Sequence, residues 1–340
     1  MKDRISPECQ LIAAVGTPLA VDESLEAAAF TAQLDRVWSS GVHGVFVAGT
    51  MGVGPLLADA TYHQLVEQAV DITRGKGNLM IGASDLSFAR TMDRIKLLNR
   101  YEIGGVVVLP PYFLRFSQEE LIAYYSSLAD ASRSPLYLYD LPQRTYVEIE
   151  ATTALTLAEH PNIAGIKCSG DLDQARELIG LVSEADVKFH VIVAQPSRLH
   201  DLVKVGVTRH LDGIYSLAPQ WAVGIVEHTK NGRDDAACRL QSDLSLLLET
   251  MRDHGGISAL TVLMNSVGIS GQFAPRPFRQ LTTTQCRELL AEPIVLKFLE
   301  SERRVPQNNK IDMAETGTGS RRFHVHEKTP TAGNVLSRRV

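Results

Sequence analysis

Eight short apolar segments alternate with eight longer segments of helical periodicity over the first 230 or so residues. The apolar segments are near-continuous runs, which is typical of parallel strands that helices cover. They recur roughly every 23 to 35 residues, about the length of one strand–helix unit. The predicted strands are residues 11–15, 44–48, 79–82, 105–109, 136–139, 163–166, 189–193 and 213–215. Eight regular units favour a closed (β/α)8 TIM barrel, with a doubly wound open sheet as the alternative.

The segments between the strands place apolar residues three and four positions apart, which predicts amphipathic helices. These helices are residues 25–38, 62–73, 88–99, 118–131, 152–159, 172–182, 196–205 and 222–228. The pattern changes after the barrel, predicted at residues 1–230. Residues 231–300 predict a C-terminal helical extension with helices at 237–251, 258–267 and 284–299. Residues 301–340 are polar and small, which predicts a disordered tail.

Composition excludes several classes of function. The 340-residue chain carries a net charge of −5, so nucleic acid is not expected as a partner. No apolar run reaches the length of a membrane span, so no membrane partner is expected. The four cysteines have no paired spacing, which argues against disulfides and a zinc motif and suits the cytoplasm. We therefore expect a cytoplasmic protein that holds no metal.

Lys167 lies at the end of the predicted strand 163–166. An ammonium group is strongly hydrated and is rarely buried without a partner. Burial or a nearby positive charge lowers the pKa of a lysine and frees its amine to attack a carbonyl. The alternative is a lysine that extends to solvent or pairs with Asp171. Active sites of such barrels lie at the C-terminal ends of the strands, which favours a catalytic lysine.

A glycine-rich loop, G-T-M-G-V-G at residues 49–54, follows the second predicted strand. Its backbone N–H groups can converge on an anion. The loop lacks the G-x-G-x-x-G spacing of a dinucleotide site, and no P-loop lysine follows it. A small carboxylate therefore suits Gly49, Met51 and Gly52 better than a pyrophosphate does. The alternative is an ordinary turn between a strand and a helix.

Other strand ends add candidate site residues. Tyr139 ends the fifth predicted strand, and its hydroxyl could move protons at an amine or carbonyl, although a strand tyrosine is more often part of the core. The hydroxyl of Thr50 is a second catalytic candidate for moving those protons. The loop after the fourth strand contains Tyr112 and Phe113. The seventh and eighth predicted strands end near Ala194 and Tyr215. We expect these residues to surround one barrel mouth.

Several motifs together resemble the dihydrodipicolinate synthase/N-acetylneuraminate lyase family. They are G-T-P-L at 16–19, G-T-M-G at 49–52, Y-D-L-P at 139–142, G-I-K at 165–167 and G-I-S-G-Q-F-A-P-R-P-F at 268–278. The resemblance covers residues 12–299. It implies that Lys167 forms a Schiff base with pyruvate or another 2-oxo acid, and that Tyr139 relays protons. It further implies that Thr50 and Met51 bind the carboxylate and that the chain forms a homo-oligomer, a dimer or tetramer.

Some positions depart from the pattern of the synthases. Met51 and Val53 stand where the synthases carry a second hydroxyl residue and a glutamate. Phe113, with Tyr112 just before it, matches the position of a second relay tyrosine. Tyr215 stands where a smaller aliphatic residue is usual. These differences affect the acceptor pocket more than the lysine and its tyrosine.

Arg144 matches the arginine that binds the acceptor carboxylate in the synthases; the alternative is a surface ion pair. We predict a lyase or aldolase that makes or breaks a carbon–carbon bond of a 2-oxo acid, with an aldehyde as its second small-molecule partner. No cofactor is expected beyond the covalent imine on Lys167. The alternatives are dihydrodipicolinate synthase, a 2-keto-3-deoxy sugar acid dehydratase, and a catalytically silent barrel that binds a 2-oxo acid or a sugar acid.

Overall fold

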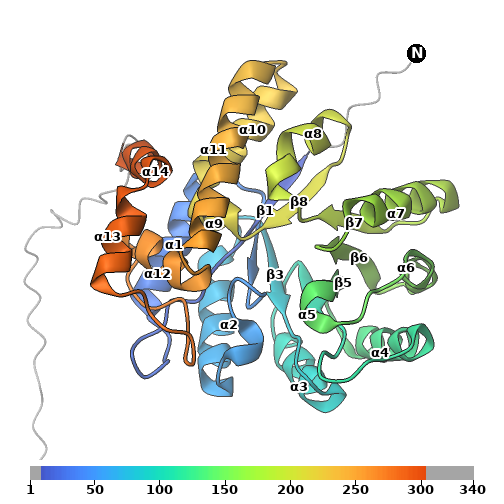
Figure 1. Ribbon diagram of the computed structural model, residues 1–340. Helices are drawn as coiled ribbons and strands as arrows, with labels where there is room; N and C mark the ends of the chain where they lie inside the picture. Colours follow the sequence, from blue (N-terminus) through green and yellow to red (C-terminus); the bar gives the residue numbers. More distant parts are fainter. Residues whose placement is uncertain (1–8, 304–340) are drawn as a thin grey trace, which may run out of the picture. The chain divides into compact units, whose positions relative to one another are not determined.

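Eight parallel strands close into a barrel in the computed structural model, which describes residues 9–303 (Figure 1). The strands are β1 (Gln10–Ala14), β2 (Gly44–Val47), β3 (Asn78–Gly82), β4 (Gly105–Val108), β5 (Leu136–Asp140), β6 (Ile163–Cys168), β7 (His190–Val193) and β8 (Arg209–Asp212). Strand β1 pairs with both β2 and β8, so the sheet has no open edge. The predicted TIM barrel is confirmed, and the open sheet is excluded.

Helices follow the strands and cover the outside of the barrel. They are α1 (Ala27–Ser39), α2 (Asp59–Thr73), α3 (Phe88–Leu98), α4 (Gln118–Ala131), α5 (Pro142–Thr145), α6 (Ala151–Ala158), α7 (Leu172–Ala185), α8 (Leu199–Lys204), α9 (Ile214–Leu217) and α10 (Pro219–Lys230). Two 3-10 turns are η1 (Gly54–Leu56) and η2 (Pro196–Arg198). Within residues 9–303, no helix is long and apolar enough to span a membrane.

Alternation along the strands creates two separate apolar cores. Residues that point inward fill the barrel, and residues that point outward pack against the helices. The inner cluster consists of Ile12, Ala14, Phe46, Met80, Val107, Leu109, Tyr137, Tyr139, Ile192 and Leu211. This parity decides which side chain at each strand end reaches the barrel mouth.

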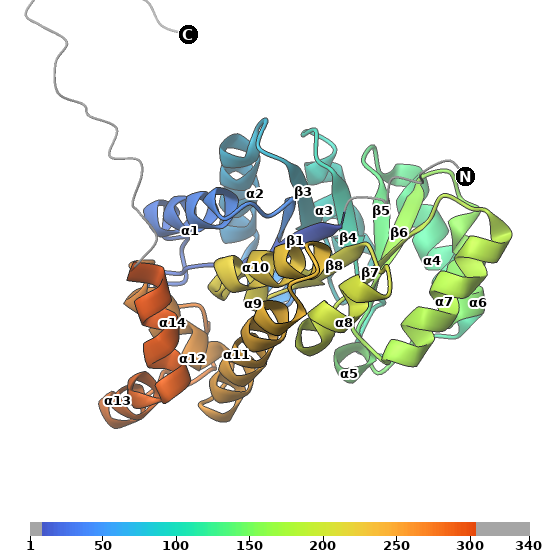
Figure 2. The same ribbon diagram turned by 90° about the horizontal axis from the view of Figure 1, so that it is seen from above.

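Four further helices follow the barrel and pack beside it. They are α11 (Asp234–Asp253), α12 (Ile257–Ser266), α13 (Thr283–Ala291) and α14 (Pro293–Arg303). In both views α13 and α14 lie on the opposite side of the barrel from α4, α6 and α7 (Figures 1 and 2). Arg36 of α1 joins Glu302 at 2.7 Å and donates to the carbonyls of Ser216 and Leu217 at the end of α9. The predicted helical extension is therefore present; residues 304–340 of the predicted tail lie outside the described residues.

The eighth strand was predicted at the wrong place. It runs from Arg209 to Asp212, and the apolar run that follows forms the short helix α9. Polar residues hid the strand, but each has a partner. Arg209 donates to Gln10 at 2.9 Å, and the buried His210 bonds the carbonyl of Val207 at 2.9 Å. Asp212 accepts from the amide of Ile214 at 3.0 Å and so turns the chain into α9.

The last predicted helix, 284–299, is two helices. The residue before a proline is driven out of the helical region by the proline ring, and Glu292 is extended, with ψ at 131°. Pro293 then begins α14, where its missing N–H costs nothing. The break lets α13 and α14 pack at an angle instead of as one rod.

Candidate active site

Lys167 is delivered to the barrel mouth by β6, and its side chain is only 5% exposed. Its Cα is in register with that of Tyr139 on the neighbouring strand β5. The amine Nζ lies 3.9 Å from the centre of the Tyr139 ring and donates to Ser169 Oγ at 2.5 Å. The lysine therefore does not extend to solvent, and its hydrogen bond goes to Ser169 instead of Asp171.

Tyr139 connects the lysine to the glycine-rich loop. The tyrosine side chain is 4% exposed and lies among the inward-facing residues of the barrel. Its ring meets the edge of Phe46 at 6.2 Å between centroids, which fixes the plane of the ring. Its hydroxyl is 3.2 Å from Thr50 Oγ1, and either group can donate. Tyr139 thus contacts Lys167 through its ring face and Thr50 through its hydroxyl, which brings three segments of the chain together.

The loop at residues 49–54 is tightly wound and partly strained. Ala48 and Val53 adopt left-handed φ angles of 54° and 48°, which residues with a Cβ rarely do. Such outliers gather at functional sites, where the surrounding structure enforces them. The Gly54 amide donates back to the Gly49 carbonyl at 3.1 Å, and Thr17 Oγ1 donates to the Gly52 carbonyl at 2.6 Å. The loop is therefore held by a hydrogen bond of its own and by Thr17, in the segment that follows β1.

Several amides of this loop, those of Thr50 and Met51 among them, have no acceptor among the described residues. Among the described residues, neither the N–H of Thr50 nor that of Met51 donates to a backbone or side-chain group. A β-carbon at Gly52 would lie 2.9 Å from the carbonyl oxygen of Val15, so the close approach requires glycine. The Met51 side chain packs against Gly213, at the end of β8. Free N–H groups beside a hydroxyl form a donor set suited to a small carboxylate.

Two aspartates that the sequence reasoning did not include flank the lysine. Burial raises the pKa of Asp140 to about 6, against the lowering effect of the Ile149 amide and of Lys167. Its Oδ1 accepts from the Ile149 amide at 3.0 Å, while its buried Oδ2 has no partner among the described residues. Burial also raises the pKa of Asp212, and Lys167 again acts in the opposite direction. These carboxyls place negative potential near the amine without contacting it.

Ser169 is a third neighbour that the sequence reasoning passed over. It lies two residues after Lys167, and a strand returns to the same face after two residues. That spacing is the signal that could have identified it. Asp212 could have been found only if the eighth strand had been located correctly.

The structure distributes the remaining predicted residues unevenly. Ala194 is buried next to the lysine strand, because its amide donates to the carbonyl of Cys168 at 2.9 Å. Tyr112 is half-buried on the loop after β4, and burial, with Asp85, raises its pKa. Phe113 beside it is 81% exposed. All three residues therefore lie near the strand ends. Only Ala194 is buried, Tyr112 is half-buried, and Phe113 is exposed.

Arg144 lies on α5, directly after β5, and its side chain is exposed. Among the described residues its guanidinium has no ion-pair or hydrogen-bond partner. Tyr215 does not join the group: it lies on α9 instead of a strand. Its fully buried ring belongs to the core outside the barrel wall, and its hydroxyl has no hydrogen-bond partner within residues 9–303. The shift of β8 explains this difference, because it moves residue 215 beyond the strand end.

The barrel with these strand-end groups is that of an aldolase-type lyase. The chain belongs to the dihydrodipicolinate synthetase family, whose profile matches residues 8–292. A 4-hydroxy-tetrahydrodipicolinate synthase of Exiguobacterium sibiricum is 27% identical over 239 residues, which is 70% of this chain and 80% of the relative. The enzyme of that name from Stenotrophomonas maltophilia (strain R551-3) is 32% identical over 208 residues, 61% and 68% of the two chains.

Solved structures agree in fold. A prophage protein of the dihydrodipicolinic acid synthase family from E. coli K12, in complex with pyruvate, aligns with a TM-score of 0.77 at 21% identity, over 86% of this chain and 98% of its own. A variant of the Sulfolobus solfataricus 2-keto-3-deoxygluconate aldolase aligns with a TM-score of 0.76 at 22% identity, over 86% and 96%. At these identities the likeness establishes the barrel and leaves the substrate open.

Proposed function

We propose that this chain forms an imine between Lys167 and pyruvate or another 2-oxo acid, and that it uses the imine to make or break a carbon–carbon bond. The buried amine over the Tyr139 ring carries the proposal, because it joins a nucleophile and a proton donor in one place. A cation over an aromatic face is stabilised by the ring quadrupole. The same ring face would stabilise the positive charge of the protonated imine.

The steps follow from the positions of these groups. The neutral amine of Lys167 attacks C2 of the 2-oxo acid, and the C2 oxygen leaves as water, which yields a protonated imine. Loss of a proton from C3 gives an enamine, which adds to the carbon of an aldehyde; the reverse sequence cleaves the bond. Tyr139 moves the protons with Thr50 as its partner, 3.2 Å away. Hydrolysis of the imine restores the amine, so the reaction needs no separate cofactor.

The carboxylate of the 2-oxo acid is proposed to bind the loop at residues 49–54. The free amides of Thr50 and Met51 point to this role, with the Thr50 hydroxyl as a third donor. Gly49 and Gly52 leave the backbone accessible, and Ala194 would complete the wall beside the lysine. Positioning of this kind converts the attack on C2 into an effectively intramolecular step.

Our first choice is a pyruvate-forming aldolase or related lyase. Condensation of pyruvate with aspartate semialdehyde, the dihydrodipicolinate synthase reaction, is the second candidate. The exposed Arg144 at the barrel mouth favours it, because an unpaired guanidinium could hold an acceptor carboxylate. The names of the curated relatives favour it as well. Phe113, where a relay tyrosine would be needed, argues against it. A sugar acid dehydratase and a silent binding barrel are tested by the same assays.

Reductive trapping tests the proposal directly. Incubation with pyruvate and cyanoborohydride should add a reduced pyruvyl group to Lys167, detected by mass spectrometry of the intact chain and of its peptides. Lys167→Met should abolish the adduct and lower any lyase activity by roughly three orders of magnitude or more. An unmodified wild-type chain, or an adduct that persists in Lys167→Met, would overturn the assignment. A panel of aldehydes and sugar acids then separates aldolase, synthase and dehydratase.

We also propose that the chain works as a homo-oligomer, a dimer or tetramer, in the cytoplasm. Large apolar side chains are exposed on neighbouring loops at the strand ends, namely Phe113, Leu114 and Tyr146, and such groups mark interaction surfaces. All four cysteines are free, which suits a reducing compartment. Light scattering coupled to gel filtration gives the oligomeric state, and Phe113→Asp should shift it toward monomer.

A further inference from the structure

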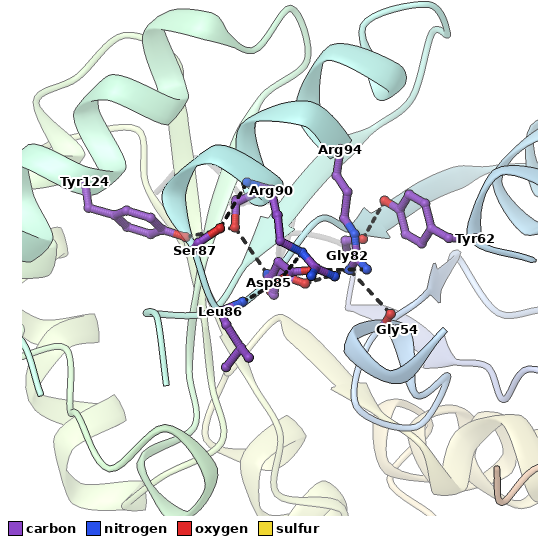
Figure 3. A network of polar contacts seen from close by, with 11 residues as sticks. Gly54, Tyr62, Gly82, Asp85, Leu86, Ser87, Arg90, Arg94 and Tyr124 are labelled. Atoms are coloured by element: carbon purple, nitrogen blue, oxygen red, sulfur yellow. Dashed lines mark hydrogen bonds and ion pairs between the residues drawn. The ribbon is translucent and has the colours of Figure 1, made fainter. Parts of the chain in front are cut away.

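A second buried charged group lies near the barrel mouth, separate from the lysine. Asp85, just after β3, and Arg94, on α3, are 3% and 5% exposed. Arg94 Nη2 is 3.3 Å from Asp85 Oδ2, and the guanidinium carbon lies 4.6 Å from the centre of the Tyr62 ring. Figure 3 shows both charges between α3 and the segment that holds Gly54. A buried ion pair costs desolvation energy, so it is weak evidence for stability alone.

The contacts of Arg94 join the loop after β3 to the loop at 49–54. Its Nη1 donates to the carbonyl of Ser84 at 2.7 Å, in the loop after β3. The same nitrogen donates to the carbonyl of Gly54 at 3.4 Å, the last residue of the loop at 49–54 (Figure 3). One nitrogen can make both bonds because Nη1 carries two N–H groups in the plane of the guanidinium.

Asp85 holds this arrangement from the other side. Its Oδ1 accepts from the Leu86 amide at 2.7 Å and pairs with Arg90 Nε at 3.0 Å, and its own amide donates to Thr91 Oγ1 at 3.2 Å. The first turn of α3 is thus tied to the loop before it. Asp85 Oδ2 and Arg94 Nη2 form an ion pair without a hydrogen bond among the described residues, so the fixed carboxylate orients the guanidinium by charge.

The loop at 49–54 needs such a support. Val53 is held in a left-handed conformation, and the Gly54 amide closes the loop on the Gly49 carbonyl. Gly54 is therefore the point at which a displacement would open the loop and turn the free amides of Thr50 and Met51. Binding groups must be held to about 0.5 Å to be effective, and loops are by default more mobile than strands.

We propose that Arg94, oriented by Asp85, is a positioning residue that fixes the loop at 49–54 for binding the carboxylate of the 2-oxo acid. Arg94 acts through the Gly54 carbonyl and does not touch the substrate. The inference rests on the proposed function, in which that loop receives the carboxylate. It predicts that loss of the guanidinium weakens recognition of the acid group while the reactivity of Lys167 toward a ketone is retained.

Reductive trapping with two ketones tests this. Pyruvate and methyl pyruvate share the reacting carbonyl, but the ester lacks the carboxylate. In Arg94→Met the pyruvate concentration that gives half-maximal trapping should rise about tenfold or more, because small displacements at a binding group have large effects. The trapping rate with methyl pyruvate should stay within about twofold of the wild type. A purely structural role would lower the melting temperature and leave the ratio of the two ketones unchanged.

Three further variants keep the test decisive. Arg176→Met removes an arginine from an exposed ion pair on α7, outside this network, and should leave the ratio unchanged. Asp85→Asn combined with Arg94→Met leaves no buried charge unpaired, so it should fold and show the same pyruvate defect. Arg94→Lys keeps the charge but cannot reach both carbonyls, so it should show a smaller defect of the same kind.

The outcomes separate the two proposals. If the wild type is trapped and the Arg94 variants show the wild-type ratio of the two ketones, the positioning role is refuted and the imine mechanism stands. If the wild type is not trapped by either ketone, the proposed function itself fails. All measurements are made well below the melting temperature of each variant, so that unfolding does not contribute.

Discussion

The strands and the loops contribute two unlike halves of the candidate site. Lys167 and Tyr139 lie on neighbouring strands in direct register and are almost fully buried. Arg144 and Phe113 lie on the connections that follow the strands and are exposed. Backbone hydrogen bonds on both sides hold a barrel strand, whereas a connection has few. Under the proposed function, the bond-making chemistry would rest on the rigid half, and the choice of the second substrate on the half that tolerates change.

The loop at residues 49–54 is an exception to this division. It is a connection, but its carbonyls are tied to Thr17 and Arg94, and its last amide is tied to Gly49. A loop that carries binding amides must be as well fixed as a strand. The useful distinction is therefore between groups held in place by hydrogen bonds and exposed groups that are not. Variants of each kind can test this distinction.

The largest effect is expected in the rigid half. Tyr139→Phe keeps the ring under the lysine amine but removes the hydroxyl that Thr50 contacts. Loss of a general acid–base group typically costs about 10²- to 10⁴-fold in turnover. We expect a drop of that size in the steady-state kcat of the reaction that forms or consumes pyruvate. The pyruvate adduct on Lys167 should still form under cyanoborohydride, only more slowly; unchanged turnover would remove Tyr139 from the mechanism.

The second effect concerns Asp140, at the end of β5. Its pKa is raised to about 6, so between about pH 4 and pH 6 the folded chain binds more protons than the unfolded chain. Stability from this group is therefore present at low pH and lost as the pH rises through that window. A shift of about two pH units corresponds to at most about 3 kcal/mol. Asp140→Asn should be more stable than the wild type at about pH 7, by roughly 1–3 kcal/mol.

The control for Asp140 is the pH dependence of that difference. Burial lowers the pKa of His210 to about 4. The contribution of His210 to the stability of the folded chain is therefore lost as the pH falls below about 6.5. His210 is present in both proteins and cancels when the variant is compared with the wild type. Urea unfolding at about pH 4 and about pH 7 should show a difference that grows with pH. An equal difference at both pH values would mean that Asp140 does not titrate in this window.

The smallest effect is expected in the exposed half. Arg144→Met removes the cation at the barrel mouth, which has no partner among the described residues. We expect the KM of a second substrate that carries a distal carboxylate to rise about tenfold, and the pyruvate adduct to be unaffected, because an exposed charge contributes modestly. The comparison of an acidic with a neutral aldehyde measures this. Equal KM changes for both aldehydes would assign Arg144 a structural role.

Much of the fold could be predicted from the sequence, because the pattern that specifies each strand–helix unit lies within a short stretch of residues. Seven strands were placed within about two residues, since continuous apolar runs bounded by turns are strong local signals. The eighth failed because Arg209, His210 and Asp212 are polar, and their partners lie on β1, on the preceding turn and on α9. The break at Pro293 was visible in the sequence but was passed over in favour of helical periodicity.

The candidate site was predictable in kind and less so in composition. Lys167 and Tyr139 could be paired because adjacent barrel strands end at the same mouth, and their register bears this out. Ser169 and Asp212 escaped because neither residue type is distinctive away from its neighbours. The brace formed by Asp85 and Arg94 was invisible, since its value lies in which carbonyls it reaches.

The sequence by itself determined the barrel, the lysine at a strand end and the glycine-rich loop, because periodicity and glycine placement act over a few residues. Only the tertiary structure decided that the amine lies over the Tyr139 ring, that Tyr215 is enclosed in the outer core, and that Arg94 reaches the Gly54 carbonyl. Those outcomes depend on the parity and register of strands distant in the chain. Closure of the barrel sets both at once.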